Sequence, residues 1–168
     1  MTKNFAAVAG LIALTALALV GCGMSPAKTD SHATPVVCQP VDAREIAGLF
    51  VRWNHSLQSG DPHAVVANYA PRSILLPTVS NKPRITAAEK EDYFEHFLAD
   101  RPSGTIDFSF IDIGCNSALD AGLYTFVFAK TGVKVAARYS FTYAWDGKQW
   151  LITSHHSSKM PEEVIPAK

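Results

Sequence analysis

Apolar side chains recur every three or four residues from Ile46 to Leu57, a spacing typical of a helix with one buried face. Asp42 followed by Glu45 has the pattern of a capping box, which predicts that the helix begins there. Gly60 predicts its end. The buried stripe consists of Ile46, Phe50, Trp53 and Leu57.

A short second helix is predicted to start at Asp61 and Pro62, because proline at the first helical position loses no hydrogen bond. We expect it to run through Val65, Val66 and Tyr69. The residues from Ser73 to Leu76 then predict a strand, with Arg84-Ile85 as its return across a loop.

A third helix opens at a second capping box, formed by Thr86 and Glu89, and ends before Pro102. Its apolar positions lie on one side of the helix. They are Tyr93, Phe94, Phe97 and Leu98.

From Thr105 onward apolar and polar side chains alternate, which is the period of a β-strand. Thr131-Gly132 and Asp146-Gly147 have the composition of tight turns, so successive strands should be antiparallel. We therefore expect an α+β fold, with helices segregated from a curved sheet. The strands carry the apolar positions of residues 106–110, 124–128, 133–145 and 150–152.

The N-terminus has the layout of an export signal, with Lys3 ahead of an apolar run over residues 5–20 that is too short for a spanning helix. The run ends in Leu19-Val20-Gly21-Cys22, which resembles a bacterial lipobox. We interpret residues 1–21 as a signal peptide, Cys22 as the lipidated residue and residues 22–40 as a flexible tether. An ordinary signal with a coincidental cysteine is the alternative.

This interpretation predicts a protein anchored by lipid in the bacterial cell envelope, on the outer membrane or facing the periplasm. The lipid would be its only contact with the membrane. Cys38 and Cys115 then remain as an even pair in a compartment that permits disulfides, and we expect them to bond. Two buried free thiols are the alternative.

Composition excludes some classes of function. The chain has 15 basic and 15 acidic side chains and only 18% charged residues, so it lacks the positive charge that nucleic-acid binding requires. Its glycines form no phosphate-binding loop, and no catalytic-triad order is present. We expect no cofactor.

The order of helices and strands resembles the nuclear-transport-factor-2-like (NTF2-like) fold, also called SnoaL-like, a cone whose strongly bent sheet encloses a pocket. Residues 93–98, 137–140, 146–151 and 155–158 look like the branch named for the calcium/calmodulin-dependent protein kinase II association domain. The resemblance spans residues 41–162 and leaves 163–168 as a tail. It implies an assembly module, and the chain contains no kinase motif of its own.

The predicted strand 133–145 has two different faces. Its odd positions carry Tyr139, Phe141 and Tyr143, and its even positions include Arg138. The resemblance suggests that the even face lines the cone and that the aromatic face lies on the opposite surface, where it would pair two copies into a homodimer. In the alternative interpretation, the aromatic face packs under the helices and Arg138 is exposed.

The candidate pocket residues follow from that orientation. Arg138 could hold an anion, and His155, on one face with Ser157, could bind a ligand or act as an acid or base. His155 and His156 face opposite ways, which disfavours a metal site. The aromatic wall is expected from Trp53, Tyr69 and Tyr93.

Three functions remain open from the sequence. The leading one is a module that dimerises and binds a small organic ligand in the cone. Anions are among the ligands that such a pocket could bind. The second is a SnoaL-like isomerase, cyclase or dehydratase that uses His155 and Arg138. The third is a purely structural oligomerisation module.

Overall fold

The computed structural model describes residues 35–78 and 80–161. The predicted signal peptide, Cys22, most of the tether and the tail lie outside these residues. All the described helices and strands belong to the unit Val36–Lys168. No helix within the described residues is both long and apolar enough to cross a membrane.

The three predicted helices are present: α1 (Ala43–Leu57), α2 (Pro62–Val66) and α3 (Ala87–Leu98). Both predicted capping boxes form, with Asp42 and Glu45 at α1 and with Thr86 and Glu89 at α3. Helix α2 ends earlier than its apolar spacing predicted, because Tyr69 begins a strand instead.

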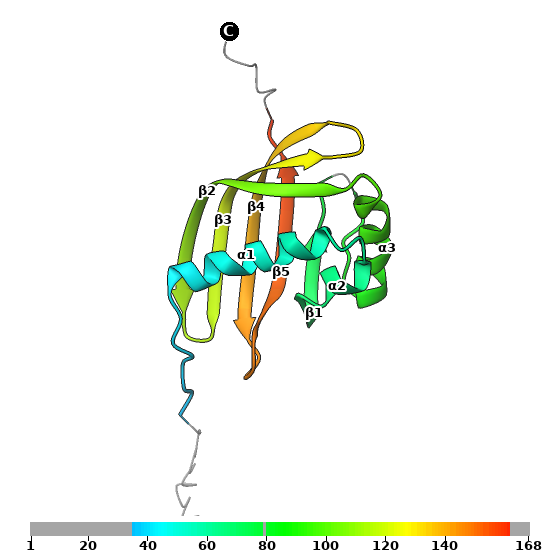
Figure 1. Cartoon of the computed structure of the whole chain (residues 1–168). Coiled ribbons are helices and arrows are strands. Elements are labelled where there is room, and N and C mark those ends of the chain that lie inside the picture. The colour runs from blue at the N-terminus through cyan, green and yellow to red at the C-terminus, as the bar shows by residue number, and fades with distance from the viewer. Residues whose placement is uncertain (1–34, 79, 162–168) are drawn as a thin grey trace, which may run out of the picture. The chain divides into compact units, whose positions relative to one another are not determined.

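A single five-stranded sheet follows the order β1-β5-β4-β3-β2 (Figure 1). Neighbouring strands from β2 to β5 are antiparallel, as the tight turns predicted, and β1 pairs with β5 in parallel. The predicted return strand is reduced to one bridge between Leu75 and Arg84. The strands are β1 (Tyr69–Leu76), β2 (Pro102–Gly114), β3 (Ser117–Phe128), β4 (Lys134–Trp145) and β5 (Trp150–Lys159).

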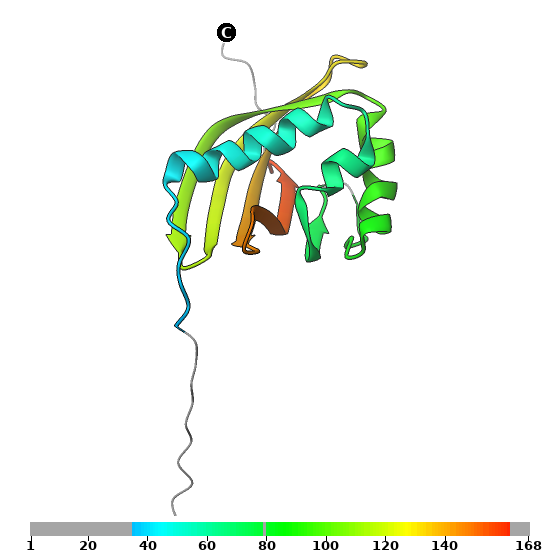
Figure 2. The ribbon, with the colours of Figure 1, turned by 60° about the horizontal axis from the view of Figure 1, so that its bottom comes forward.

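Helix α1 lies across one face of the sheet, while α2 and α3 lie at the end formed by β1 (Figures 1 and 2). We call the face under α1 the inner face and the opposite one the outer face. Phe50 of α1 is stacked on Tyr139, with ring centroids 6.3 Å apart, and Trp53 meets Phe141 edge-on at 5.5 Å. The aromatic side chains of β4 therefore form the core.

The prediction that this aromatic face is an external dimer surface is wrong. Tyr139, Phe141 and Tyr143 are buried on the inner face, and Arg138, on the other side of the strand, is exposed. The physical reason is that a helix covers only one face of the sheet, and burying the aromatic face removes more apolar area from water.

The predicted disulfide between Cys38 and Cys115 is formed. Beside it, Asn116 accepts a hydrogen bond from the Gln39 backbone at 2.7 Å and donates one to the Val37 carbonyl at 2.9 Å. Asn116 has φ 58°, a left-handed conformation that asparagine tolerates better than most residues. The segment before α1 is thereby attached to the turn between β2 and β3.

Candidate functional site

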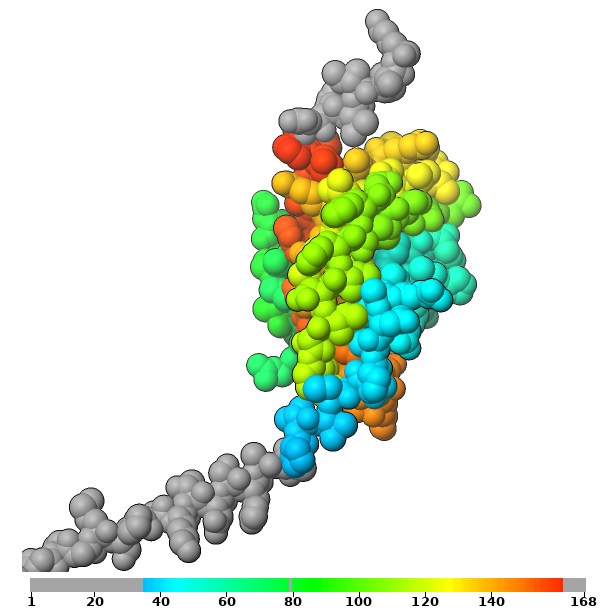
Figure 3. Space-filling view, turned by 90° about the vertical axis from the view of Figure 1, so that its left-hand side faces the viewer, coloured from blue at the N-terminus to red at the C-terminus, as the bar shows by residue number. Residues whose placement is uncertain are grey.

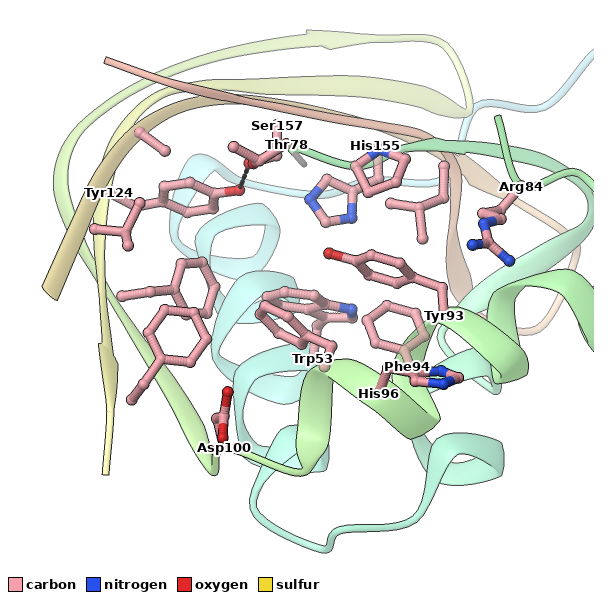
Figure 4. Close-up of a pocket in the computed structure, with 17 residues that line it drawn as sticks. Trp53, Thr78, Arg84, Tyr93, Phe94, His96, Asp100, Tyr124, His155 and Ser157 are labelled. Atoms are coloured by element: carbon pink, nitrogen blue, oxygen red, sulfur yellow. Dashed lines mark hydrogen bonds between the residues drawn. The ribbon is translucent and has the colours of Figure 1, made fainter. Parts of the chain in front are cut away.

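A cavity of about 400 Å³ lies between α3, the inner face of the sheet and the segment that follows β1 (Figure 4). This volume is within the range of small-molecule sites, which is roughly 300–1,000 Å³. Its wall is largely aromatic. The rings come from Trp53, Tyr93, Phe94, Phe97, Tyr124, Phe126 and Phe128.

A bulge in β5 decides which of its side chains enter the cavity. Thr142 of β4 pairs with Ser154 while Tyr143 pairs with Ile152, so Thr153 is the extra residue. Ile152 and His155 consequently both belong to the inner face, although their numbers differ by three. The prediction that His155 shares a pocket with Arg138 is wrong, because Arg138 is exposed on the outer face. The extra residue, Thr153, has its hydroxyl 2.9 Å from that of Thr142.

His155 is buried, with 4% of its surface exposed. Its ring is stacked on Phe141 at 4.1 Å between centroids and meets the Trp53 indole edge-on at 5.2 Å. Burial, with a smaller effect from neighbouring His156, lowers the pKa of His155 to about 3. The imidazole is therefore neutral at physiological pH.

The position of the imidazole proton follows from its partner. The Tyr69 hydroxyl lies 2.8 Å from Nδ1 of His155, and burial raises the pKa of Tyr69 well above its usual value, so the hydroxyl keeps its proton. The other polar group beside the hydroxyl is the Trp53 indole N–H, which can only donate, so we assign the hydroxyl proton to the bond with Nδ1. His155 then carries its own proton on Nε2, which is buried and has no partner in the described part of the chain.

Three hydroxyl groups form a second polar cluster in the cavity wall (Figure 4). Tyr124 donates to Ser157 Oγ at 2.5 Å, and Thr78 Oγ1 lies 2.5 Å from the same oxygen. Burial raises the pKa of Tyr124 well above its usual value, so this cluster is uncharged. The three hydroxyls are therefore hydrogen-bonded to one another.

Charged side chains line only the edge of the cavity. Arg84 bonds the Asp92 carboxylate and donates to the Glu89 carbonyl at 3.2 Å, while its buried Nε has no partner among residues 35–78 and 80–161. Asp100 forms an ion pair with Lys130 at 3.8 Å. The aromatic interior between them is uncharged.

The structure brings together most of the predicted pocket residues. Trp53, Tyr93, His155 and Ser157 line the cavity, and Tyr69 lies behind His155, bonded to its ring. The placement of Arg138 inside the cone is wrong, because its side chain is exposed on the outer face.

Arg84 and Tyr124 also line the cavity but were not predicted. Tyr124 could have been found from its alternation with Phe126 and Phe128, once the inner face was known. Arg84 follows an irregular loop and had no such signal. No three His, Cys, Asp or Glu side chains gather closely enough to hold a metal ion in the part of the chain that the structure describes.

Helices packed on a curved mixed sheet give this chain the α+β fold of NTF2-like proteins, which is also called cystatin-like. An NTF2-like protein of Novosphingobium aromaticivorans with a cystatin-like fold superposes with a TM-score of 0.61 at 13% identity, covering 73% of this chain and 84% of its own. A Streptomyces avermitilis protein of the NTF2-like family, provisionally named a dehydratase, has a TM-score of 0.64 at 10% identity, covering 71% and 96%.

Within this class the chain belongs to the calcium/calmodulin dependent protein kinase II association domain family, whose model matches residues 42–161. A Xanthomonas campestris protein named for the same association domain is 45% identical, with a TM-score of 0.70. The alignment covers 78% of this chain and 98% of that one. No curated protein sequence matches the chain significantly.

Proposed function

We propose that this domain binds a small organic molecule in the cavity beside His155, without kinase activity of its own. The observation that carries the proposal is a cavity of about 400 Å³ whose aromatic wall includes the buried imidazole of His155, and Nε2 of that ring has no partner within the described residues. Apolar cavities with a few convergent polar groups are the usual form of small-molecule sites.

The enzyme alternative has weaker support. A general base works best with a pKa near the operating pH, whereas the pKa of His155 is about 3. Arg138, the predicted stabiliser of negative charge, lies on the outer face. The buried carboxylate of Asp120 accepts hydrogen bonds from Ser109 and Tyr139 and does not orient His155.

The test is a fragment library with neutral, anionic and cationic members, screened by ligand-observed NMR. Val135 lines the cavity, so Val135→Trp should fill much of it and abolish binding. Lys134→Trp is the matched control, because Lys134 is the exposed neighbour and lies outside the cavity. Arg138→Ala should also leave binding unchanged.

The proposal is overturned if no fragment binds the wild-type protein, or if every fragment that binds still binds Val135→Trp. Circular dichroism and the unfolding midpoint establish that each variant is folded before its binding is compared.

A second proposal concerns self-association, which the family suggests. Phe108 and Phe110 of β2 are each 58% exposed on the outer face, and Phe108 pairs with Leu123 of β3. Figure 3 looks onto the edge of the sheet, where β2 (yellow-green) runs beside the start of α1 (cyan). We propose that two copies pair through these outer-face side chains, because neighbouring exposed phenylalanines favour burial against a partner.

We also propose that the chain is exported and anchored through Cys22 in the cell envelope, which is where the cavity would meet its ligand. The disulfide between Cys38 and Cys115 supports an oxidising compartment.

A further inference from the structure

We infer that the cavity takes a neutral, largely apolar ring compound whose carbonyl oxygen accepts a hydrogen bond from Nε2 of His155. The inference deepens the proposed binding function and rests on it. It replaces the expectation of an anionic ligand, which depended on Arg138.

The unpaired hydrogen-bond donors in the cavity wall favour a ligand that carries a hydrogen-bond acceptor. His155 Nε2 carries a proton and has no partner within the described residues. The buried Trp53 Nε1, a donor only, also makes no well-formed hydrogen bond there, and its nearest acceptor is the Tyr69 hydroxyl. Both side chains line the cavity, with 4% and 1% of their surfaces exposed. A buried donor without an acceptor is unfavourable, so a ligand that brings an acceptor removes that deficit.

The charges select a neutral molecule. An anion in the interior would lose its hydration and find no cation there, because the Arg84 guanidinium lies at the edge and its charge is paired with Asp92, although its Nε has no partner within the described residues. The Asp100 carboxylate lines the same cavity and is paired with Lys130, so it offers an anion no attraction. A cation would face the N–H groups of His155 and Trp53 with the wrong polarity.

The aromatic side chains of the cavity wall favour a ligand that contains a ring. In Figure 4 Tyr93 points its hydroxyl end into the cavity, while Trp53 and Phe94 close the side nearest α3. Rings pack well against aromatic edges and faces, which supply most of the contact area in such a site. The carbonyl then fixes the orientation of the ring.

The experiment compares three probes on one naphthalene ring, substituted at one position: acetylnaphthalene, ethylnaphthalene and naphthoate. Titration calorimetry of the wild-type protein should show the ketone binding about tenfold more tightly than the hydrocarbon, the factor that a well-made neutral hydrogen bond supplies. Naphthoate should bind most weakly.

His155→Phe should reduce the preference for the ketone over the hydrocarbon to less than about twofold, since it removes the donor and keeps an apolar ring. A measurement independent of the variant is the NMR signal of the Nε2–H proton in nitrogen-labelled wild-type protein. It should shift with the ketone and stay in place with the hydrocarbon.

Two results overturn the inference while leaving the binding function intact. One is that naphthoate binds most tightly and loses its affinity in Arg84→Gln. The other is that ketone and hydrocarbon bind equally and neither moves the Nε2–H signal. If none of the three probes binds although fragments enter the cavity, the ligand class is wrong. If no fragment enters either, the proposed function fails with it.

Discussion

Acidification should unfold this domain through His155, because the folded state holds that imidazole neutral in an aromatic core. The unfolded chain binds a proton at about the ordinary pKa of 6.5, whereas the folded chain binds it only at about 3. Between these values the unfolded state carries more protons, so stability rises with pH. The contribution is complete above pH 6.5 and is lost as pH falls toward 3.

The magnitude follows from the difference between the two pKa values. Each pKa unit corresponds to about 1.4 kcal/mol, so the free energy of unfolding should fall by roughly 3 kcal/mol between pH 6.5 and 4.5 and by about 5 kcal/mol at pH 3. Domains of this size are stable by only about 5–15 kcal/mol, so the loss is a large fraction of the total.

The assay is urea unfolding at several pH values for the wild-type protein and for His155→Asn. Asparagine keeps an acceptor near the Tyr69 hydroxyl but has no charge to gain. The pKa of Glu89 is lowered to about 2 by backbone hydrogen bonds from Thr86 and Ile85, and this group destabilises both proteins equally below its usual pKa. The wild-type slope should exceed that of the variant by about 1.4 kcal/mol per pH unit. Parallel curves would refute the reasoning.

Three further predictions concern other parts of the chain. Replacing Cys38 and Cys115 by serine should lower the free energy of unfolding in urea by up to about 4 kcal/mol, because the bridge closes a long loop in the unfolded chain; an unchanged midpoint contradicts this. Phe110→Ser should shift sedimentation toward the monomer, while Val51→Ser, an exposed apolar control on α1, should not; equal sedimentation of the two variants rejects the outer-face pairing. Cys22→Ser should abolish incorporation of labelled fatty acid in a bacterial host, and continued labelling of that variant would rule out the predicted anchor.

Local signals in the sequence determined the secondary structure well. The two capping boxes placed the starts of α1 and α3, and alternation identified the antiparallel strands, because both patterns depend only on residues near one another in the chain. Tyr69 shows the limit of such signals. Its spacing from Val65 and Val66 suits a helix, but pairing with Ile152, far along the chain, makes it the first residue of β1.

Local sequence patterns could not predict which residues form the candidate site. Alternation separated Arg138 from Tyr139 and Phe141, yet it could not say which face the helices cover, and that single choice moved Arg138 from the interior to the surface. The bulge at Thr153 likewise arises from the register between β4 and β5, which places His155 beside Trp53 and Tyr69. The sequence by itself thus determined the elements, the family resemblance and the pairing of the cysteines. Only the tertiary structure decided which side chains share a cavity, because burial is a property of packing between distant segments.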